Sequence, residues 1–306
     1  MTSPWDPTGE LPRRTAVRYV TPLREGGSMP GVVEADDLGT YVMKFRSAGQ
    51  GVKVLVAEVV VGELARALDL PVPEMVALEL PEALSRYEPD EEVQDLLRAS
   101  IGLNLGTDFL PGAHGYDGSV PPAPEVAARL LWLDAFTANV DRTWSNPNLV
   151  VWHGVPWLID HGAALYFHHA WPGTAAEHAP DPARSARQPF DASQHVTAAV
   201  VPAEPGTMAR VHAELAPRIG QAVREAVAAV PGEWLETTGG LPTADAVRDA
   251  YVDFLTARLA GAEHWLPGDD ALAAARAGAE AGRAEAQRTL KMQARRAVVR
   301  QGEEPR

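Results

Sequence analysis

The residues best suited to chemistry lie in two short stretches separated by a predicted hairpin. The first is Asn139-Val-Asp-Arg-Thr-Trp-Ser-Asn-Pro-Asn148, and the second is Trp157-Leu-Ile-Asp-His-Gly162. Two carboxylates, Asp141 and Asp160, follow apolar segments, and asparagine amides lie between them in the sequence. Carboxylate and amide oxygens in such a set can hold a divalent metal and a triphosphate while orienting a hydroxyl nucleophile. The pattern predicts a phosphotransferase.

Each of these polar residues has a predicted role in that reaction. We expect Asp141 to accept the proton of the attacking hydroxyl or to orient it. Asp160 and one asparagine, Asn146 or Asn148, would bind Mg²⁺, which prefers oxygen ligands and keeps waters for its other positions. Taken singly, each residue also suits an ordinary turn or cap. Their combination with an upstream lysine and glutamate favours the catalytic interpretation.

Lysine is scarce in this chain, and that makes Lys44 informative. Of the 27 basic residues only Lys44, Lys53 and Lys291 are lysines, so a retained lysine suggests a specific role. Alternation along the predicted strand 40–46 puts Lys44 on the face opposite the bulky apolar residues, where it can reach a ligand. The alternative is a solvated lysine at a sheet edge.

Glu58 is the predicted partner of this lysine. It lies in a predicted helix over 52–68, where Glu63 has Arg66 at i+3 but Glu58 has only apolar neighbours. A buried carboxylate without a cation is costly, and Lys44 is the nearest unexplained cation. A strand lysine paired with a helix glutamate fits a device that holds the lysine against nucleotide phosphates. The alternative is that Glu58 lies on the wet face of the helix.

A glycine-rich turn, Glu25-Gly-Gly-Ser-Met-Pro-Gly31, lies between two predicted strands. Its backbone N–H groups could cover phosphates, which makes Gly26, Gly27, Ser28 and Gly31 candidate nucleotide-binding residues. Ser28 could also be phosphorylated itself. The stretch matches neither the Walker pattern nor GxGxxG, so a plain loop is the alternative.

The order of predicted elements divides the chain into three parts. Residues 1–84 contain strands and one helix, and residues 85–267 are mostly helical around a buried helix at 125–139. We expect 101–112 to be irregular and to line a cleft. Residues 268–306, rich in Ala, Arg and Glu, form a solvated helix or a docking arm.

Composition excludes several classes of function. A formal net charge of −14, without a long run of Lys or Arg, disfavours direct nucleic-acid binding. Absence of cysteine excludes disulfides and thiolate sites, and the histidines lack the spacing of a zinc motif, so the loop at 161–201 is expected to face substrate. No signal-peptide pattern and no long apolar run occurs. We expect a cytoplasmic protein that does not bind membranes.

Asp141-Arg-Thr-Trp-Ser-Asn146, two strands and Ile159-Asp-His-Gly162 together resemble the catalytic and metal-binding loops of the HipA-like kinases and their phosphoinositide-kinase-like relatives. In that family Asp-x-His-x-x-Asn and Ile-Asp-Phe-Gly are typical. The resemblance covers roughly residues 15 to 260. It implies an α+β, bilobed protein-kinase-like fold with a small β-rich N-terminal lobe carrying one helix, a larger, mostly helical C-terminal lobe, and use of ATP and Mg²⁺.

The same resemblance assigns individual roles. It implies that Lys44 binds phosphate, Glu58 is its helix partner, Asp141 is the catalytic aspartate and Asp160 binds the metal. Spacing from Asp141 selects Asn146 as the amide ligand, whereas Asn148 directly precedes the strand, as in many kinases.

The chain also departs from the family pattern. Thr143 replaces the usual His, His161 replaces Phe, and the glycine turn is only loosely similar. HipA toxins carry an additional N-terminal region and pair with a DNA-binding antitoxin. This chain begins almost at the first predicted lobe, so neither toxicity nor such a partner carries over from the resemblance.

These observations predict a kinase that transfers the γ-phosphate of ATP to a hydroxyl, with protein Ser or Thr as the favoured acceptor. A small-molecule or lipid kinase of the same fold is one alternative. A pseudokinase or nucleotide-binding scaffold is another, and the departures at Thr143 and His161 favour it. The physiological substrate and the oligomeric state are not indicated by the sequence.

Overall fold

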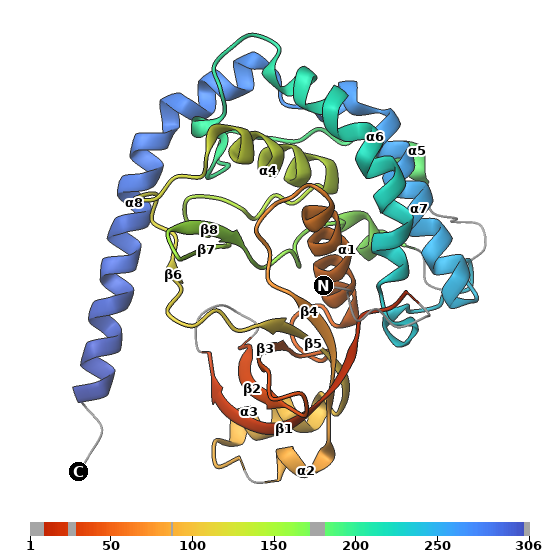
Figure 1. The fold of residues 1–306 in the computed structure, drawn as a ribbon, viewed down its shortest axis with the longest axis vertical. Coiled ribbons are helices and arrows are strands. Elements are labelled where there is room, and N and C mark those ends of the chain that lie inside the picture. The colour runs from red at the N-terminus through yellow and green to blue at the C-terminus, as the bar shows by residue number, and fades with distance from the viewer. Residues whose placement is uncertain (1–8, 24–28, 87, 172–180, 303–306) are drawn as a thin grey trace.

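The computed structural model describes residues 9–23, 29–86, 88–171 and 181–302. Figure 1 shows a strand-rich part at one end of the molecule and helices at the other, with a long C-terminal helix along one side. The β-rich N-terminal region and the helical C-terminal region predicted from the sequence are therefore both present.

Within the described residues, five N-terminal strands close into a barrel in the order β1-β2-β3-β5-β4. They are β1 (Arg13–Pro22), β2 (Gly31–Ala35), β3 (Thr40–Lys44), β4 (Met75–Leu80) and β5 (Gly102–Asp108). Neighbouring strands are antiparallel except β1 and β4, which run parallel. Barrel residues such as Met43 and Leu78 share a core with Val93 and Leu97 of α3 (Glu91–Ala99), which follows the short α2 (Glu82–Ser85).

The prediction that 101–112 is irregular is wrong for β5. This strand pairs with both β3 and β4, so it completes the barrel. Its sequence hides the pattern because Asn104 and Gly106 interrupt it. Asn104 is buried and bonds Ser100 O and Gly102 O through its side chain. A Cβ at Gly106 would lie 2.8 Å from Val76 Cγ2, so the close approach of β4 requires glycine there.

Helix α1 (Val52–Ala67) joins the barrel to the helices, as Figure 1 shows. Its buried face contains residues such as Leu64, which share one core with Leu103 and Leu105 of β5 and with the helices α4 and α6. This explains why apolar residues lie on most sides of the helix, because different sides pack against different elements. The predicted helices at 52–68 and 125–139 agree with α1 and α4 to within two residues at each end.

The remaining described elements form the helical part and a small sheet. The helices are α4 (Pro124–Thr137), α5 (Pro182–Ala186), α6 (Thr207–Ala228) and α7 (Ala244–Ala260), with the 3-10 helices η1 (Tyr166–Ala170), η3 (Ala198–Val200), η4 (Gly232–Trp234) and η5 (Ala262–His264). The described strands β6 (His114–Gly115), β7 (Leu149–Trp152) and β8 (Val155–Leu158) pair in that order. The hairpin β7–β8 was predicted, and it holds the two candidate catalytic stretches at its ends.

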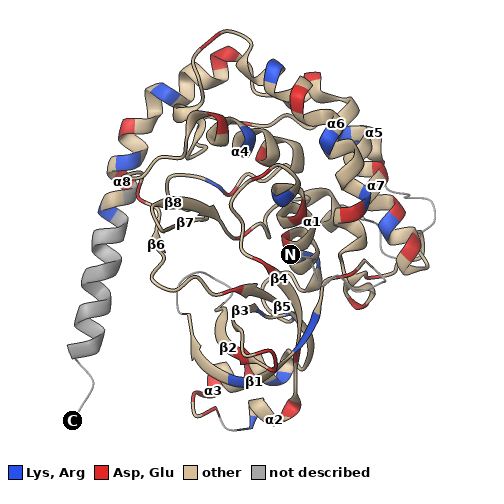
Figure 2. Ribbon diagram, viewed as in Figure 1, with Lys and Arg blue, Asp and Glu red and all other residues tan. Residues whose placement is uncertain are grey.

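Helix α8 (Asp269–Gly302) begins against the helical part and then runs along the side of the molecule. Leu272 and Ala275 are buried in the main core, so the first turns of α8 pack against the rest of the protein. Of the two predictions for this segment, a solvated helix is wrong for these turns, and a docking arm stays a prediction. Acidic and basic residues are mixed along α6, α7 and α8 (Figure 2). Of the helices that the structure describes, none is long and apolar enough to cross a membrane.

The strands of the barrel do not all come from the first predicted part of the chain, residues 1–84. β5 lies after residue 84 but belongs to the barrel. The division of the chain at residues 84 and 267 stays a prediction, and by sheet membership Gly102–Asp108 would go with the first part.

Replacing Leu105 by Ala tests the place of β5 in the barrel. Leu105 has no exposed surface and packs in the core that α1 shares with β5. Its truncation should lower the free energy of unfolding by about 2–5 kcal/mol, because a cavity is left behind. Chemical denaturation gives the value. The matched variant Leu38→Ala, at a side chain 95% exposed, should change stability by less than about 0.5 kcal/mol. Equal stability of the two variants would place Leu105 outside the core.

Candidate active site

Lys44, at the end of β3, lies between two carboxylates from distant parts of the chain. Its Nζ donates to Glu58 Oε1 on α1 and, at 2.9 Å, to Asp160 Oδ1 just after β8. Glu58 also accepts a hydrogen bond from the backbone N–H of His161. The expected partnership of Lys44 with Glu58 is therefore formed, and Asp160 joins it.

Burial and charge act in opposite directions on these groups. Burial alone would lower the pKa of Lys44, but the two carboxylates outweigh it, so the pKa is raised and the ammonium is kept. Burial raises the pKa of Glu58 despite the lysine beside it. The charge of Lys44 lowers the pKa of Asp160, which therefore stays ionised. The Asp160 side chain is 50% exposed, so it can also reach a ligand from solvent.

The loop that carries Asp160 fits closely against α1. Asp160 has a φ of 55°, in the left-handed region that non-glycine residues seldom occupy. A Cβ at Gly162 would lie 2.6 Å from Val54 Cγ1 and 3.2 Å from Glu58 Oε1. Glycine is therefore required at 162 for the loop to approach the helix that holds Glu58.

Asp141 is held by the two asparagines predicted as metal ligands. Its Oδ2 accepts hydrogen bonds from Asn146 Nδ2 at 2.8 Å and from Asn148 Nδ2 at 3.3 Å. Because each amide nitrogen faces Asp141, the amide oxygen is the atom that each asparagine can offer to a cation. The loop thus orients the candidate base and leaves oxygen ligands for a metal.

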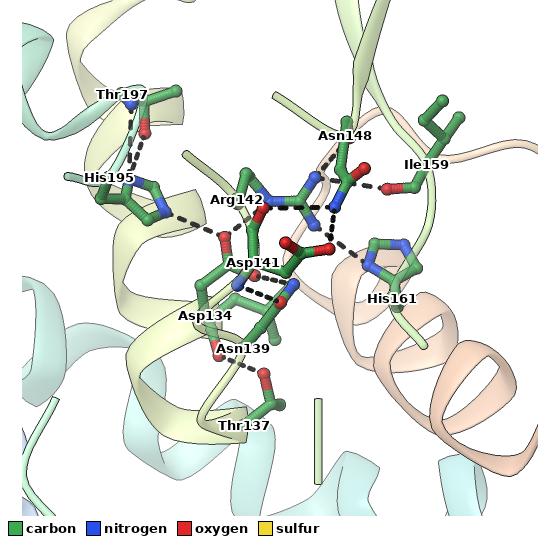
Figure 3. Close-up of polar contacts among 11 residues, drawn as sticks. Asp134, Thr137, Asn139, Asp141, Arg142, Asn148, Ile159, His161, His195 and Thr197 are labelled. Atoms are coloured by element: carbon green, nitrogen blue, oxygen red, sulfur yellow. Dashed lines mark hydrogen bonds and ion pairs between the residues drawn. The ribbon is translucent and has the colours of Figure 1, made fainter. Parts of the chain in front are cut away.

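Arg142 connects this catalytic loop to the loop that carries Asp160 (Figure 3). Its Nη1 donates to the carbonyls of Asn148 and, at 3.3 Å, Ile159, and its Nη2 lies 3.2 Å from His161 Nδ1. The last two contacts flank Asp160 on both sides. One guanidinium therefore fixes both loops relative to each other.

Asp134, on α4, neutralises Arg142. Its Oδ2 accepts from Arg142 Nε at 2.6 Å and lies 2.9 Å from His195 Nε2, and its Oδ1 accepts from Asn139 Nδ2 at 3.0 Å. The Asp134 and Arg142 side chains have no exposed surface. Asn139 Oδ1 in turn accepts from the backbone N–H of Asp141 at 3.3 Å. The network thus extends from α4 to the candidate catalytic residue.

This environment fixes the charge states within the network. Burial opposes ionisation of Asp134, but Arg142 and His195 lower its pKa to about 2. Burial and the charge of Arg142 lower the pKa of His161 to about 3, so its imidazole is neutral and Nδ1 can accept from Arg142. Histidine at 161 thus gives Arg142 a hydrogen-bond acceptor that phenylalanine would lack.

The predicted site residues form two groups that Arg142 links. Lys44, Glu58 and Asp160 lie together, and so do Asp141, Asn146 and Asn148, as the contacts above show. Gly26, Gly27 and Ser28 lie outside the described residues. Gly31 begins β2, and a Cβ there would lie 2.5 Å from Tyr19 Cε2, so packing accounts for this glycine. Its nucleotide-binding role stays a prediction.

Sequence reasoning missed the buried residues behind the site. Asp134, Asn139, Arg142 and His195 were given no role, although Asp134 is an acid in the apolar run Leu130–Phe136 of a predicted buried helix. That isolation was the available signal, because a carboxylate facing a core needs a partner. That His195 is a partner of Asp134 could not be found in this way, since the two residues are 61 positions apart in the sequence.

The residues at this site could supply some, but not all, of the ligands of a magnesium ion. The described residues contain no cluster of three or more His, Cys, Asp or Glu that could hold a metal. Mg²⁺ in a nucleotide site takes only one or two protein ligands beside phosphates and waters, and Asp160 and one asparagine amide would supply them. Asp160 is ionised and half-exposed, so its carboxylate is the negative group in this cluster that suits a cation.

A family model described as HipA-like kinase matches residues 17–265. The chain belongs to the HipA-like kinase family, and this membership supports a phosphotransferase. The search of curated proteins gave no match. Among solved structures, the Golgi casein kinase is similar with a TM-score of 0.35 and 11% identity over 83% of this chain and 72% of that one.

Replacing Asp134 by Asn tests the buried pair. The variant keeps the shape but leaves the Arg142 charge unpaired, which should cost about 3–5 kcal/mol at pH 7. The pKa of Asp134 in the folded protein, about 2, lies below the usual 3.8. The ionised carboxylate therefore stabilises the fold fully above pH 3.8, and this stabilisation is lost as the pH falls toward 2.

Chemical denaturation at a series of pH values measures both effects. The wild type should lose stability more steeply than Asp134→Asn as the pH falls from 4 toward 2. Asp253→Asn, at an exposed position on α7, is the matched control and should behave as the wild type. Equal stability of the two variants at pH 7 would show that the pair is not needed.

Proposed function

We propose that this protein transfers the γ-phosphate of ATP to a hydroxyl, with Mg²⁺ as the metal and a protein Ser or Thr as the acceptor. The observation that carries the proposal is the position of Lys44, held between Glu58 and Asp160. The barrel and the helical part would form the two lobes, with the nucleotide between them. Family membership supports the kinase part of this proposal, and the finer parts are inferred from the site.

Lys44 would supply positive charge to the phosphates. Glu58 fixes its ammonium from α1, so the lysine does not depend on its ligand for orientation. Asp160 and an asparagine amide would hold Mg²⁺, which when bound neutralises charge on the phosphate oxygens. The half-exposed carboxylate of Asp160 is suited to this because it can change partners without unfolding its loop.

Asp141 would orient the acceptor hydroxyl and take its proton. The amides of Asn146 and Asn148 hold one of its oxygens, so the carboxylate has a defined direction before substrate arrives. This kind of fixed geometry supplies much of the rate in phosphoryl transfer.

Both departures from the family pattern make contacts that preserve the site. The Thr143 hydroxyl accepts from Asn146 N at 3.3 Å, and His161 accepts from Arg142. Neither replacement removes the lysine, the two aspartates or the asparagines. These contacts favour an active enzyme over a pseudokinase.

Replacing Asp141 by Asn should abolish transfer and leave nucleotide binding largely intact, because Asp141 lies outside the Lys44 group. The assay is incubation with radiolabelled ATP and Mg²⁺, alone and with a cell lysate, beside a separate measurement of ATP binding. Asp249→Asn, exposed on α7, is the matched control. Unchanged turnover in Asp141→Asn would contradict the assignment of Asp141 as the catalytic base.

The same assay separates the alternatives. Label on protein Ser or Thr supports a protein kinase, whereas label only on small molecules or lipids contradicts the proposed acceptor. Stabilisation by ATP without any transfer would mean a pseudokinase.

Replacing Asp160 by Asn should raise the Mg²⁺ concentration needed for half-maximal transfer by at least about tenfold, because even indirect support of a metal is worth that much. A magnesium titration at saturating ATP measures it. Asn146→Ala and Asn148→Ala, titrated in parallel, identify the amide ligand by the same shift. If Asp160→Asn titrates like the wild type, this residue does not bind the metal.

A further inference from the structure

The catalytic loop contains one side chain that the proposed chemistry leaves unexplained. Of residues 143–147, all of which the structure describes, only Trp144 is buried. It lies three residues after Asp141 and two before Asn146, the amide that contacts the Asp141 carboxylate. Whatever holds this indole therefore also holds the turn between the two.

The turn around Trp144 is closed by short-range hydrogen bonds. Thr143 N donates to Asp141 O and to Asn146 O, each at 3.0 Å, and Asn146 N donates to Thr143 Oγ1. Such a small turn moves as a unit. A displacement of Trp144 would thus be passed to Asn146 and to the carboxylate that Asn146 orients.

Two glycines meet opposite ends of the indole. A Cβ at Gly282 of α8 would lie 2.5 Å from Trp144 Cδ1 and 2.8 Å from Cγ, on the five-membered ring. A Cβ at Gly118 would lie 3.1 Å from Cζ3, on the six-membered ring. Arg283 Cζ lies 5.5 Å from the centre of the Trp144 ring, within the range of a cation–π contact. Helix α8 therefore touches the catalytic loop directly.

Helix α8 is anchored upstream of this contact. Gly206 N donates to both oxygens of Asp269 at 3.1 Å, and Arg276 Nη2 donates to Val201 O at 2.9 Å and Pro202 O at 3.1 Å. Leu272 is buried in the main core. These contacts fix the helix on the helical part, so the turn with Gly282 and Arg283 is brought to Trp144 by a supported element.

We propose that α8 positions the catalytic loop, with Gly282 and Arg283 acting on Asp141 through Trp144. Glycine is a poor helix former, so its place at 282, within the helix, is explained by the indole it approaches. Helix α8 lies beyond the residues 17–265 that match the family, so this support comes from outside the matched region. The inference rests on the proposed function for its effect on catalysis.

The deciding comparison is between the variants Gly282→Ala and Gly278→Ala. Both changes add a methyl group to the same helix and raise its helix propensity, but a Cβ at Gly278 meets nothing within 4 Å. Gly282→Ala should lower kcat about ten- to a hundredfold, since small displacements of catalytic groups have effects of that size. The KM for ATP should stay near the wild-type value, because Lys44 and Asp160 are not touched. Gly278→Ala should match the wild type in both.

Hydrogen exchange of the amides of Thr143 and Asn146 gives a readout that does not need activity. Both amides are bonded within the turn, and they should exchange faster in Gly282→Ala than in Gly278→Ala. Equal exchange in the two variants would overturn the inference. If the wild type transfers no phosphate, the proposed function fails, and the exchange comparison still decides whether α8 positions this loop.

Discussion

The buried ion pair of Asp134 and Arg142 is the constraint on which the site depends. Neither side chain has exposed surface, so each charge must be satisfied from within the protein. Asp134 does this with Asn139 and His195, and Arg142 does it with carbonyls and with His161. All of these partners except His195 belong to the two loops that carry the candidate aspartates. Movement of either loop alone would break hydrogen bonds to this buried pair, so the pair gives the loops one common position.

Lys44 imposes a second link, between the barrel and the hairpin. Its partners come from α1 and from the end of β8, and α1 packs in the core that β5 shares with α4 and α6. Lys53, on the first turn of α1, donates to His168 O at 2.8 Å and ties the same helix to the segment after Asp160. Two of the three lysines in the chain therefore act on the placement of the Asp160 loop. Their retention in an arginine-rich sequence agrees with this specific use.

Residues that differ from the family pattern make specific contacts within the site. His161 stays unprotonated because burial and Arg142 lower its pKa, and this lets it accept from Arg142. Trp144, within the same catalytic stretch, is covered by a helix outside the matched residues. The geometry around Asp141 thus depends on parts of the chain that the family pattern does not include.

The sequence by itself determined several local elements and named a set of candidate site residues. Periodicity located α1, α4 and the hairpin. Glu58, which has only apolar neighbours nearby in the sequence, was enough to name Lys44, because a buried acid requires a cation. It failed at β5, where Asn104 and Gly106 serve tertiary contacts that erase the strand pattern. Only the tertiary structure decided that Asp160 shares Lys44, that Arg142 joins the loops, and that α8 reaches Trp144. Each of these depends on groups far apart in sequence, and local propensity carries no information about which distant surfaces meet.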